Sequence, residues 1–141
     1  MLTIREEQMR AFRPAADVVF AKRVATSVRA NHGDASVRLP AGTFTVRRLP
    51  EETLRRLVRG GIARAREYEL SHESALAAFV VLMFETAPNF DRHPVIRRIL
   101  TDENVPPNSR VDRLLEEVTE QNWEAVKQSY DAGAWAPEAP Q

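Results

Sequence analysis

The sequence predicts an all-α fold, a single-domain bundle of five to six helices around a buried central helix at about residues 72–86. Ten consecutive apolar residues, Ala75 to Phe84, form the most apolar stretch of the chain, and a helix that is apolar all round must be buried on every side. Other segments repeat apolar residues every three or four positions, the period of an amphipathic helix, and prolines and glycines separate them. The 141 residues suffice for a core, and the lack of cysteine excludes disulfides and thiolate chemistry.

The first helical segment begins near Ile4, where Thr3 and Glu6 form a capping-box pattern. Pro14 predicts either a kink or the first residue of a second helix. Beyond it, we expect one helix face to carry Val18, Ala21, Val24, Ala25 and Val28, with Phe20 at its edge and Val19 on the polar side. Gly33 is the expected left-handed residue at the end of this helix.

Two short runs of apolar and β-branched residues flank Pro40 and Gly42. Their alternation predicts a small β-hairpin at residues 37–47, and an ordered but irregular loop is the alternative. An isolated hairpin is only marginally stable, so this one needs to lie against the bundle or against a partner.

The next helix is expected at residues 51–68, because Pro50 precedes two acidic residues that favour the positive end of a helix dipole. Gly61 lies in the middle of its apolar face, where a glycine costs roughly 1 kcal/mol relative to alanine. We therefore expect another backbone to approach closely there, namely the central helix through Ala77 or Ala78.

The central helix should begin with Ser71 as its N-cap and end near Thr86, because Pro88 disfavours helix in the residue before it. The short connection to residues 51–68 predicts an antiparallel pair of helices. We expect the most buried side chains of the central helix to be Phe79, Leu82 and Met83.

Prolines divide the last third of the chain into further helices. A short helix starts at Pro94, and a longer one starts after Asn108 or Ser109, with a break near residues 119–122.

The helical domain is expected to span residues 1–130 and to be followed by a disordered tail at 131–141. The tail consists mainly of alanine, proline and other small or polar residues, which is typical of a chain end without a packed core. Trp135 is its one large apolar residue and therefore a candidate anchor.

We identify no catalytic, cofactor or metal site in the sequence. The histidines His32, His72 and His93 lie far apart in the chain, and no zinc, phosphate-loop or nucleophile-elbow motif occurs. Asp91 and His93 lie two residues apart in a predicted loop, and they are the best candidates for an acid/base pair. The stronger interpretation is structural: Asp91 makes a turn, and His93 caps the next helix.

The net charge is zero, but it is unevenly distributed. Residues 1–70 hold 14 Lys+Arg against 8 Asp+Glu, a charge of +6, and residues 71–141 hold 6 against 12, a charge of −6. The simpler explanation is that the two halves pack together and neutralise each other. The alternative is an electropositive surface that meets an acidic partner. The candidate partner-binding residues are five arginines and the tail tryptophan: Arg47, Arg48, Arg55, Arg59, Arg66 and Trp135.

Three segments carry a resemblance: MLTIREEQM at residues 1–9, IARAREY at 62–68, and NFDRHP at 89–94, which Ile99 and Leu100 follow. Together they are similar to a group of small helical bacterial proteins found alongside type VI secretion tip and effector components. The resemblance implies an accessory or adaptor protein, and it transfers no active-site residues.

We therefore expect a non-enzymatic protein–protein interaction module, an accessory or adaptor protein acting beside a secreted effector or a secretion tip component. The alternative is a regulator that binds nucleic acid through the arginine face of residues 51–68. Acid-rich sequence follows those arginines and no aromatic platform accompanies them, so we favour a protein partner. No cofactor is expected, and homo-oligomerisation is left open. The acidic N-terminus and the lack of an apolar membrane span predict a cytoplasmic location.

Overall fold

The computed structural model describes the backbone of residues 2–135 and the side chains of residues 17–135. This part of the chain contains six α-helices, which are α1 (Leu2–Asn31), α2 (Glu51–Glu67), α3 (Glu73–Glu85), α4 (Pro94–Leu100), α5 (Arg110–Glu117) and α6 (Glu120–Gln128). An antiparallel hairpin of β1 (Ser36–Leu39) and β2 (Gly42–Thr45) follows α1. Short 3₁₀ turns are η1 (Val46–Arg48), η2 (Phe90–Arg92), η3 (Pro107–Ser109) and η4 (Ala132–Trp135). The structure is 69% helical, which confirms the predicted fold class.

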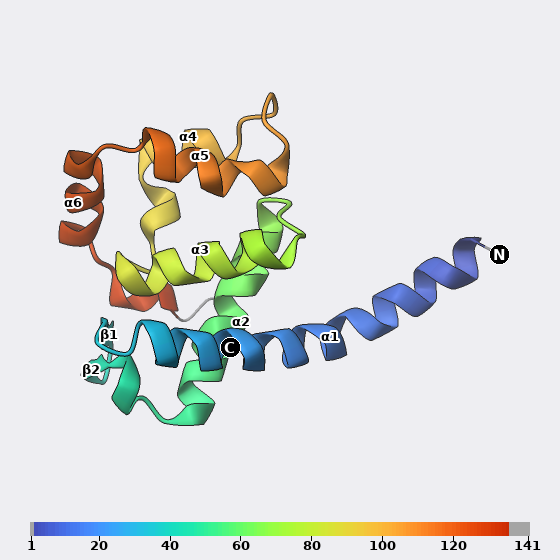
Figure 1. Ribbon diagram of the computed structural model, residues 1–141, viewed down its shortest axis with the longest axis horizontal. Helices are drawn as coiled ribbons and strands as arrows, with labels where there is room; N and C mark the ends of the chain where they lie inside the picture. The colour runs from blue at the N-terminus through green and yellow to red at the C-terminus, as the bar shows by residue number, and fades with distance from the viewer. Residues whose placement is uncertain (1, 136–141) are drawn as a thin grey trace.

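The central helix is α3, as the apolar run predicts. It packs against α2, α5 and β1, and Figure 1 shows it in yellow-green between α5 and α1. Leu76, Phe79 and Val80 are completely buried, and Met83 is nearly so. Leu82 is only partly buried and packs at the rim of the core, so its expected place among the most buried side chains is wrong.

Gly61 on α2 does mark a close approach of α3, but not at the predicted residues. A Cβ atom at Gly61 would lie 2.9 Å from Sδ of Met83 and 3.1 Å from Cγ2 of Val80. Ala77 and Ala78, which are expected to make this contact, are only partly buried, and neither is among the nearest neighbours of that Cβ.

The start of α3 is capped from another part of the chain. His72 occupies the N-cap position and its side chain makes no capping hydrogen bond, so the prediction of Ser71 as N-cap is wrong. Instead, Oδ1 of Asn108 accepts hydrogen bonds from the amides of Ser71 and His72, both at 2.8 Å. Asn108 therefore links the segment before α5 to the N-terminal end of α3.

At the end of α1, Gly33 is needed for its small size and not for a left-handed backbone conformation. Gly33 is buried, and a Cβ atom there would lie 2.8 Å from the carbonyl oxygen of Arg29. The one glycine with positive φ in the described chain is Gly42, at 148° in the hairpin. The predicted left-handed conformation of Gly33 is therefore wrong, and close backbone packing explains the glycine.

The hairpin prediction is confirmed, with slightly different ends. Val37 pairs with Phe44 and Leu39 pairs with Gly42. Val37 is completely buried, because β1 lies against α3 and η4. The bundle thus provides the support that a two-stranded hairpin needs.

The helix α1 runs through Pro14 as one element, so the alternative of a second helix that starts at Pro14 is wrong. The expected capping box of Thr3 and Glu6 falls on side chains outside those that the structure describes. Figure 1 shows the N-terminal half of α1 extending away from the other helices. We call the backbone of residues 2–16 the α1 arm.

The end of the chain departs from the predicted tail. Residues Ala132–Trp135 form η4, and Trp135 is only 4% exposed. Its ring centre lies 4.8 Å from that of Phe84, and its Nε1 donates to the Tyr130 hydroxyl at 2.8 Å. Residues 131–135 are therefore part of the packed domain, and the rest of the predicted tail, 136–141, lies outside the described residues.

The predicted break in the last long helix is confirmed, although it lies slightly earlier. Val118 ends α5 with an extended backbone. Thr119 then caps α6, and its side chain accepts a hydrogen bond from the Asn122 amide at 3.1 Å.

Candidate functional site

A buried ion pair joins α2 to the loop after α3. Asp91 is 3% exposed, and its Oδ1 accepts from Arg64 at 3.3 Å while its Oδ2 accepts from the Tyr68 hydroxyl at 2.8 Å. Arg64 lies on α2 and Tyr68 is the C-cap residue four positions later, so both side chains project from the same side of the helix end. Arg64 also donates to the carbonyl oxygens of Pro88 and Ala134. Each carboxylate oxygen of Asp91 thus accepts a hydrogen bond from this helix end, which is the arrangement of a structural group.

Burial raises the pKa of Tyr68, and the negative charge of Asp91 and its hydrogen bond raise this pKa further. The guanidinium of Arg97, 3.5 Å from the hydroxyl, acts in the opposite direction and lowers the pKa. A tyrosine with a raised pKa stays protonated and acts as a hydrogen-bond donor at neutral pH. The Tyr68 hydroxyl therefore stays a donor to Asp91 and helps to hold that carboxylate in place.

A second buried cation, Arg110, closes the loop between α4 and α5. Its Nε donates to the carbonyl oxygen of Val105 at 3.0 Å, and its NH1 donates to that of Leu100 at 3.0 Å. Its carboxylate neighbour, Glu69, lies 3.7 Å away and is largely exposed. The guanidinium thus satisfies backbone carbonyls at a helix end, which is again a structural role.

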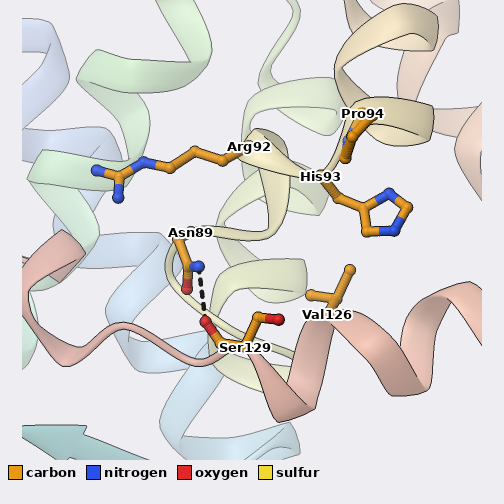
Figure 2. A pocket seen from close by; sticks show the side chains of 6 residues that line it. All are labelled: Asn89, Arg92, His93, Pro94, Val126 and Ser129. Carbon is orange, nitrogen blue, oxygen red and sulfur yellow. Dashed lines mark hydrogen bonds between the residues drawn. The ribbon is translucent and has the colours of Figure 1, made fainter.

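The histidine of the expected acid/base pair is partly buried, and its side chain is used at the start of α4. Nδ1 of His93 accepts a hydrogen bond from the Val95 amide at 3.2 Å, so the structural interpretation, a cap on the following helix, is confirmed. Figure 2 shows the side chains of Arg92 and His93 extending in opposite directions. The structure does not bring Asp91 and His93 together as a catalytic pair.

The hollow beside His93 has a volume of about 220 Å³ and is lined by Asn89, Arg92, His93, Pro94, Val126 and Ser129. Within it, the side chain of Asn89 donates to the carbonyl oxygen of Ser129 at 3.0 Å (Figure 2). The guanidinium of Arg92, one of the lining residues, pairs with Asp131 at 3.2 Å. No set of converging charges remains in the hollow to orient a substrate.

A second hollow of about 240 Å³ lies between β1, the end of α3 and α6. On its wall, the guanidinium carbon of Arg38 lies 4.3 Å from the ring centre of Tyr130. Another wall residue, Glu85, is 2.5 Å from Nδ1 of His32. Glu85 is thus engaged by His32, and Arg38 lies over an aromatic ring.

Two of the predicted partner-binding residues are used inside the domain. Arg66 makes a two-pronged contact to Asp17, with Nε at 3.1 Å and NH2 at 2.7 Å from the carboxylate oxygens. Trp135 is buried against Phe84. The arginine fastens α2 to α1, and the tryptophan fastens η4 to α3, so neither side chain is displayed to a partner.

The other four arginines lie on the surface, and two of them have acidic neighbours. Arg47 is 2.6 Å from Asp34, and Arg55 is 3.2 Å from Glu51. Arg48 and Arg59 are exposed, and none of the described residues forms an ion pair with them. The predicted arginine face is therefore divided: part of it neutralises local acids, and part of it remains on the surface.

Large apolar side chains are exposed at two places on helices. Val18 and Val19 on α1 are 50% and 61% exposed, and Leu115 on α5 is 60% exposed. The expectation that Val18 belongs to the buried face is wrong, and Phe20, which was expected at the edge of that face, is only 6% exposed. The two valines lie next to Asp17, where α1 leaves the body of the domain. The helical spacing of the sequence predicts an exposed position for Val19 but not for Val18.

Neither metal ligands nor membrane spans are found in the part of the chain that the structure describes. No group of three or more His, Asp or Glu side chains is placed there to hold a metal ion. None of the helices within residues 2–135 combines the length and the apolar character that crossing a membrane requires. In comparisons with known proteins, no family model, no curated protein and no solved structure matches this chain.

Proposed function

We propose that this chain is a non-enzymatic protein–protein interaction module that binds its partner through the α1 arm. The observation that carries the proposal is the extension of α1 beyond the domain (Figure 1). The helix has 30 residues, and its contacts with the body include the Asp17–Arg66 pair at 2.7 Å. A helix segment shorter than about 12–15 residues is marginal in water without packing. A partner that covers the arm would therefore stabilise it.

The exposed valines support the same surface. Val18 and Val19 continue from the body onto the base of the arm, and both are at least half exposed. Helices that dock into a partner's groove use apolar anchors three, four and seven positions apart, so these two consecutive valines would contribute to such a face together with further residues of α1. The structural roles of Asp91, His93 and Arg110 agree with a binding protein, because each of these side chains is used to hold the fold.

The partner that we propose is a secreted effector or a component of a type VI secretion tip, and the protein would act as its accessory or adaptor in the cytoplasm. This part of the proposal is supported by the resemblance of the segments at residues 1–9, 62–68 and 89–94.

The test is co-purification with effector and tip proteins encoded beside this chain, using wild type, Val19→Glu and Leu115→Glu. Both variants replace an exposed apolar side chain by a carboxylate, and the wild-type residues are about equally exposed, Val19 at 61% and Leu115 at 60%. The thermal stability of both variants should therefore change little. We expect Val19→Glu to lose the partner and Leu115→Glu to keep it. Equal retention by both variants, or a chain that stays alone with every candidate, contradicts the proposal.

Binding to nucleic acid is the second candidate, favoured by the exposed Arg48, Arg56 and Arg59 around the start of α2. Phosphate contacts by arginine weaken as salt rises. A mobility shift of nucleic acid at low salt would support this function if it disappears in a variant in which all three of these arginines are replaced by glutamate. The lack of any shift at low salt excludes it.

A further inference from the structure

One edge of the hairpin is closed by a side chain from another part of the domain. The amide of Arg38 on β1 points away from β2 and donates to the Tyr130 hydroxyl at 3.0 Å. The same hydroxyl accepts from Nε1 of Trp135 at 2.8 Å. The outer edge of β1 is therefore occupied by the segment that follows α6.

The direction of the Arg38 amide also fixes the direction of the groups on β2. Arg38 lies opposite Thr43, and opposed residues in an antiparallel ladder alternate between pairs that exchange hydrogen bonds and pairs that do not. Because the Arg38 amide points outward, the N–H and C=O of Thr43 must point outward on the other side. They lie on the open edge of β2.

The next residues of the ladder place Thr45 in the same orientation. The amide of Val46 donates to the carbonyl oxygen of Ala35 at 2.9 Å, so the ladder bonds resume one residue after Thr45. Thr45 lies opposite Ser36 in the intervening pair, which does not exchange hydrogen bonds. Thr43 thus presents an N–H and a C=O along one edge, and Thr45 adds a second N–H at the spacing of alternate residues that a neighbouring strand uses. The C=O of Thr45 belongs to the start of η1, because Thr45 is the N-cap of that turn.

The surroundings of this edge are exposed and basic. Phe44, between the two threonines, is 36% exposed, and the hairpin lies at the margin of the domain (Figure 1). Residues 35–50 contain three arginines and no acidic residue. Of these, Arg38 lies over the Tyr130 ring, and Arg47 pairs with Asp34 at 2.6 Å. Arg48, which follows β2 and is exposed, is therefore the arginine left to attract a carboxylate.

We propose that β2 accepts an extended, acid-bearing segment of a partner protein as a third strand, paired to the outward N–H and C=O groups of Thr43 and to the outward N–H of Thr45. The main-chain pairing would supply the docking geometry, and Arg48 after β2 would favour a carboxylate on the added strand. This inference deepens the proposed interaction function, but it uses a surface separate from the α1 arm. The Val19→Glu variant should therefore leave strand addition unchanged.

The backbone of Thr45 allows a precise variant. Its φ of −84° and ψ of 150° lie close to the conformation that proline imposes. Thr45→Pro should therefore remove one outward N–H while leaving the ladder bonds of the hairpin intact. Thr45→Ala is the matched control, because it removes the side-chain hydroxyl and keeps the N–H.

The probe is a phage-displayed library of random short peptides selected on the wild-type protein, followed by fluorescence anisotropy with the enriched peptides. We expect the enriched peptides to carry Asp or Glu at alternate positions. Their affinity should fall at least about tenfold in Thr45→Pro, which loses a main-chain donor and blocks the edge with its ring. It should stay nearly unchanged in Thr45→Ala, and Arg48→Glu should weaken it.

A second measurement does not depend on the folding of a variant. Two peptides are made from one enriched sequence, each N-methylated at alternate residues, one at the odd positions and one at the even positions. One of the two should lose binding, because its methylated N–H groups face β2. The other should still bind, because its methylated N–H groups point away from β2. Equal effects of the two methylation patterns overturn strand addition, as does equal affinity for wild type and a folded Thr45→Pro protein, or the lack of any enriched peptide. A wild-type dimer that becomes a monomer in Thr45→Pro would show that the occupant is a second copy of this chain, which also overturns the proposal.

Discussion

The Tyr68 hydroxyl donates a hydrogen bond of 2.8 Å to Oδ2 of Asp91, and this bond joins α2 to the loop that leaves the central helix. The other carboxylate oxygen receives Arg64 at 3.3 Å. A buried carboxylate with two donors is stable only while both donors remain, because desolvation penalises an unpaired charge.

Replacement of Asp91 should therefore be costly. Asp91→Ala leaves the buried guanidinium of Arg64 without its counter-ion, and we expect a loss of about 3 kcal/mol in the free energy of unfolding. Asp34→Ala is the control, since Asp34 pairs with Arg47 at 2.6 Å with its side chain 90% exposed. Its loss should stay below about 1 kcal/mol. Urea denaturation measures the free energy of unfolding of both variants. Similar losses in the two would show that the buried ion pair stabilises the fold no more than the exposed one.

The raised pKa of Tyr68 gives the fold an alkaline pH dependence. Because burial and Asp91 raise this pKa in the folded state, the folded state holds the phenol proton more tightly than the unfolded state. The resulting stability is present below about pH 10, the pKa of a free tyrosine, and it is lost as the pH rises through the folded-state value. Denaturation at increasing pH should show a steeper alkaline loss for wild type than for Tyr68→Phe. Tyr130→Phe is the control, because it removes the other tyrosine of the chain. If stability falls with pH as steeply in Tyr68→Phe as in wild type, another group causes the alkaline loss of stability.

The glycine pair on α2 allows a test of the contact with α3. Gly61→Ala gains roughly 1 kcal/mol of helix propensity, but its Cβ would lie 2.9 Å from Sδ of Met83 and 3.1 Å from Cγ2 of Val80. Overpacking of this kind typically costs about 1–3 kcal/mol, so we expect a net loss. The neighbouring Gly60→Ala should gain up to about 1 kcal/mol. Thermal unfolding compares them, and a more stable Gly61→Ala protein would mean that α3 moves away easily.

Trp135 should contribute to stability rather than to partner binding. Truncation of a buried aromatic side chain costs about 3–5 kcal/mol, and Trp135→Ala also removes the donor to Tyr130 at 2.8 Å. We expect a large drop in the melting temperature. Trp135→Phe keeps the ring contact with Phe84 and should lose less. A Trp135→Ala protein with the melting temperature of wild type would return the segment to the predicted disordered tail.

The position of the central helix could be predicted from the sequence, because the apolar run and Pro88 mark it directly. Its rotation could not be predicted. When every side of a helix is apolar, no periodicity shows which residues face a given neighbour, and for this reason Ala77 and Ala78 were chosen at Gly61 in place of Val80 and Met83. The same ambiguity misplaced Leu82.

The polar contacts were less accessible to sequence reasoning. Arg64 and Asp91 are 27 positions apart, and an Asp in a loop usually makes a turn, so nothing local marked it as a buried ion. Arg66 and Asp17 are 49 positions apart, and the spacing on α2 could indicate only that the arginine was polar. His93 was correctly interpreted as a cap, because capping depends on the residues beside it.

Arg64 binds three acceptors that the chain delivers at different times. Pro88 and Asp91 follow it closely in the sequence, but Ala134, whose carbonyl oxygen lies 2.6 Å from its NH2, is among the last described residues to be synthesised. During synthesis from the N-terminus, Arg64 therefore lacks one of its three acceptors until residues 131–135 are added. A chain that terminates before residue 131 would leave this guanidinium short of an acceptor and the Phe84 ring without Trp135.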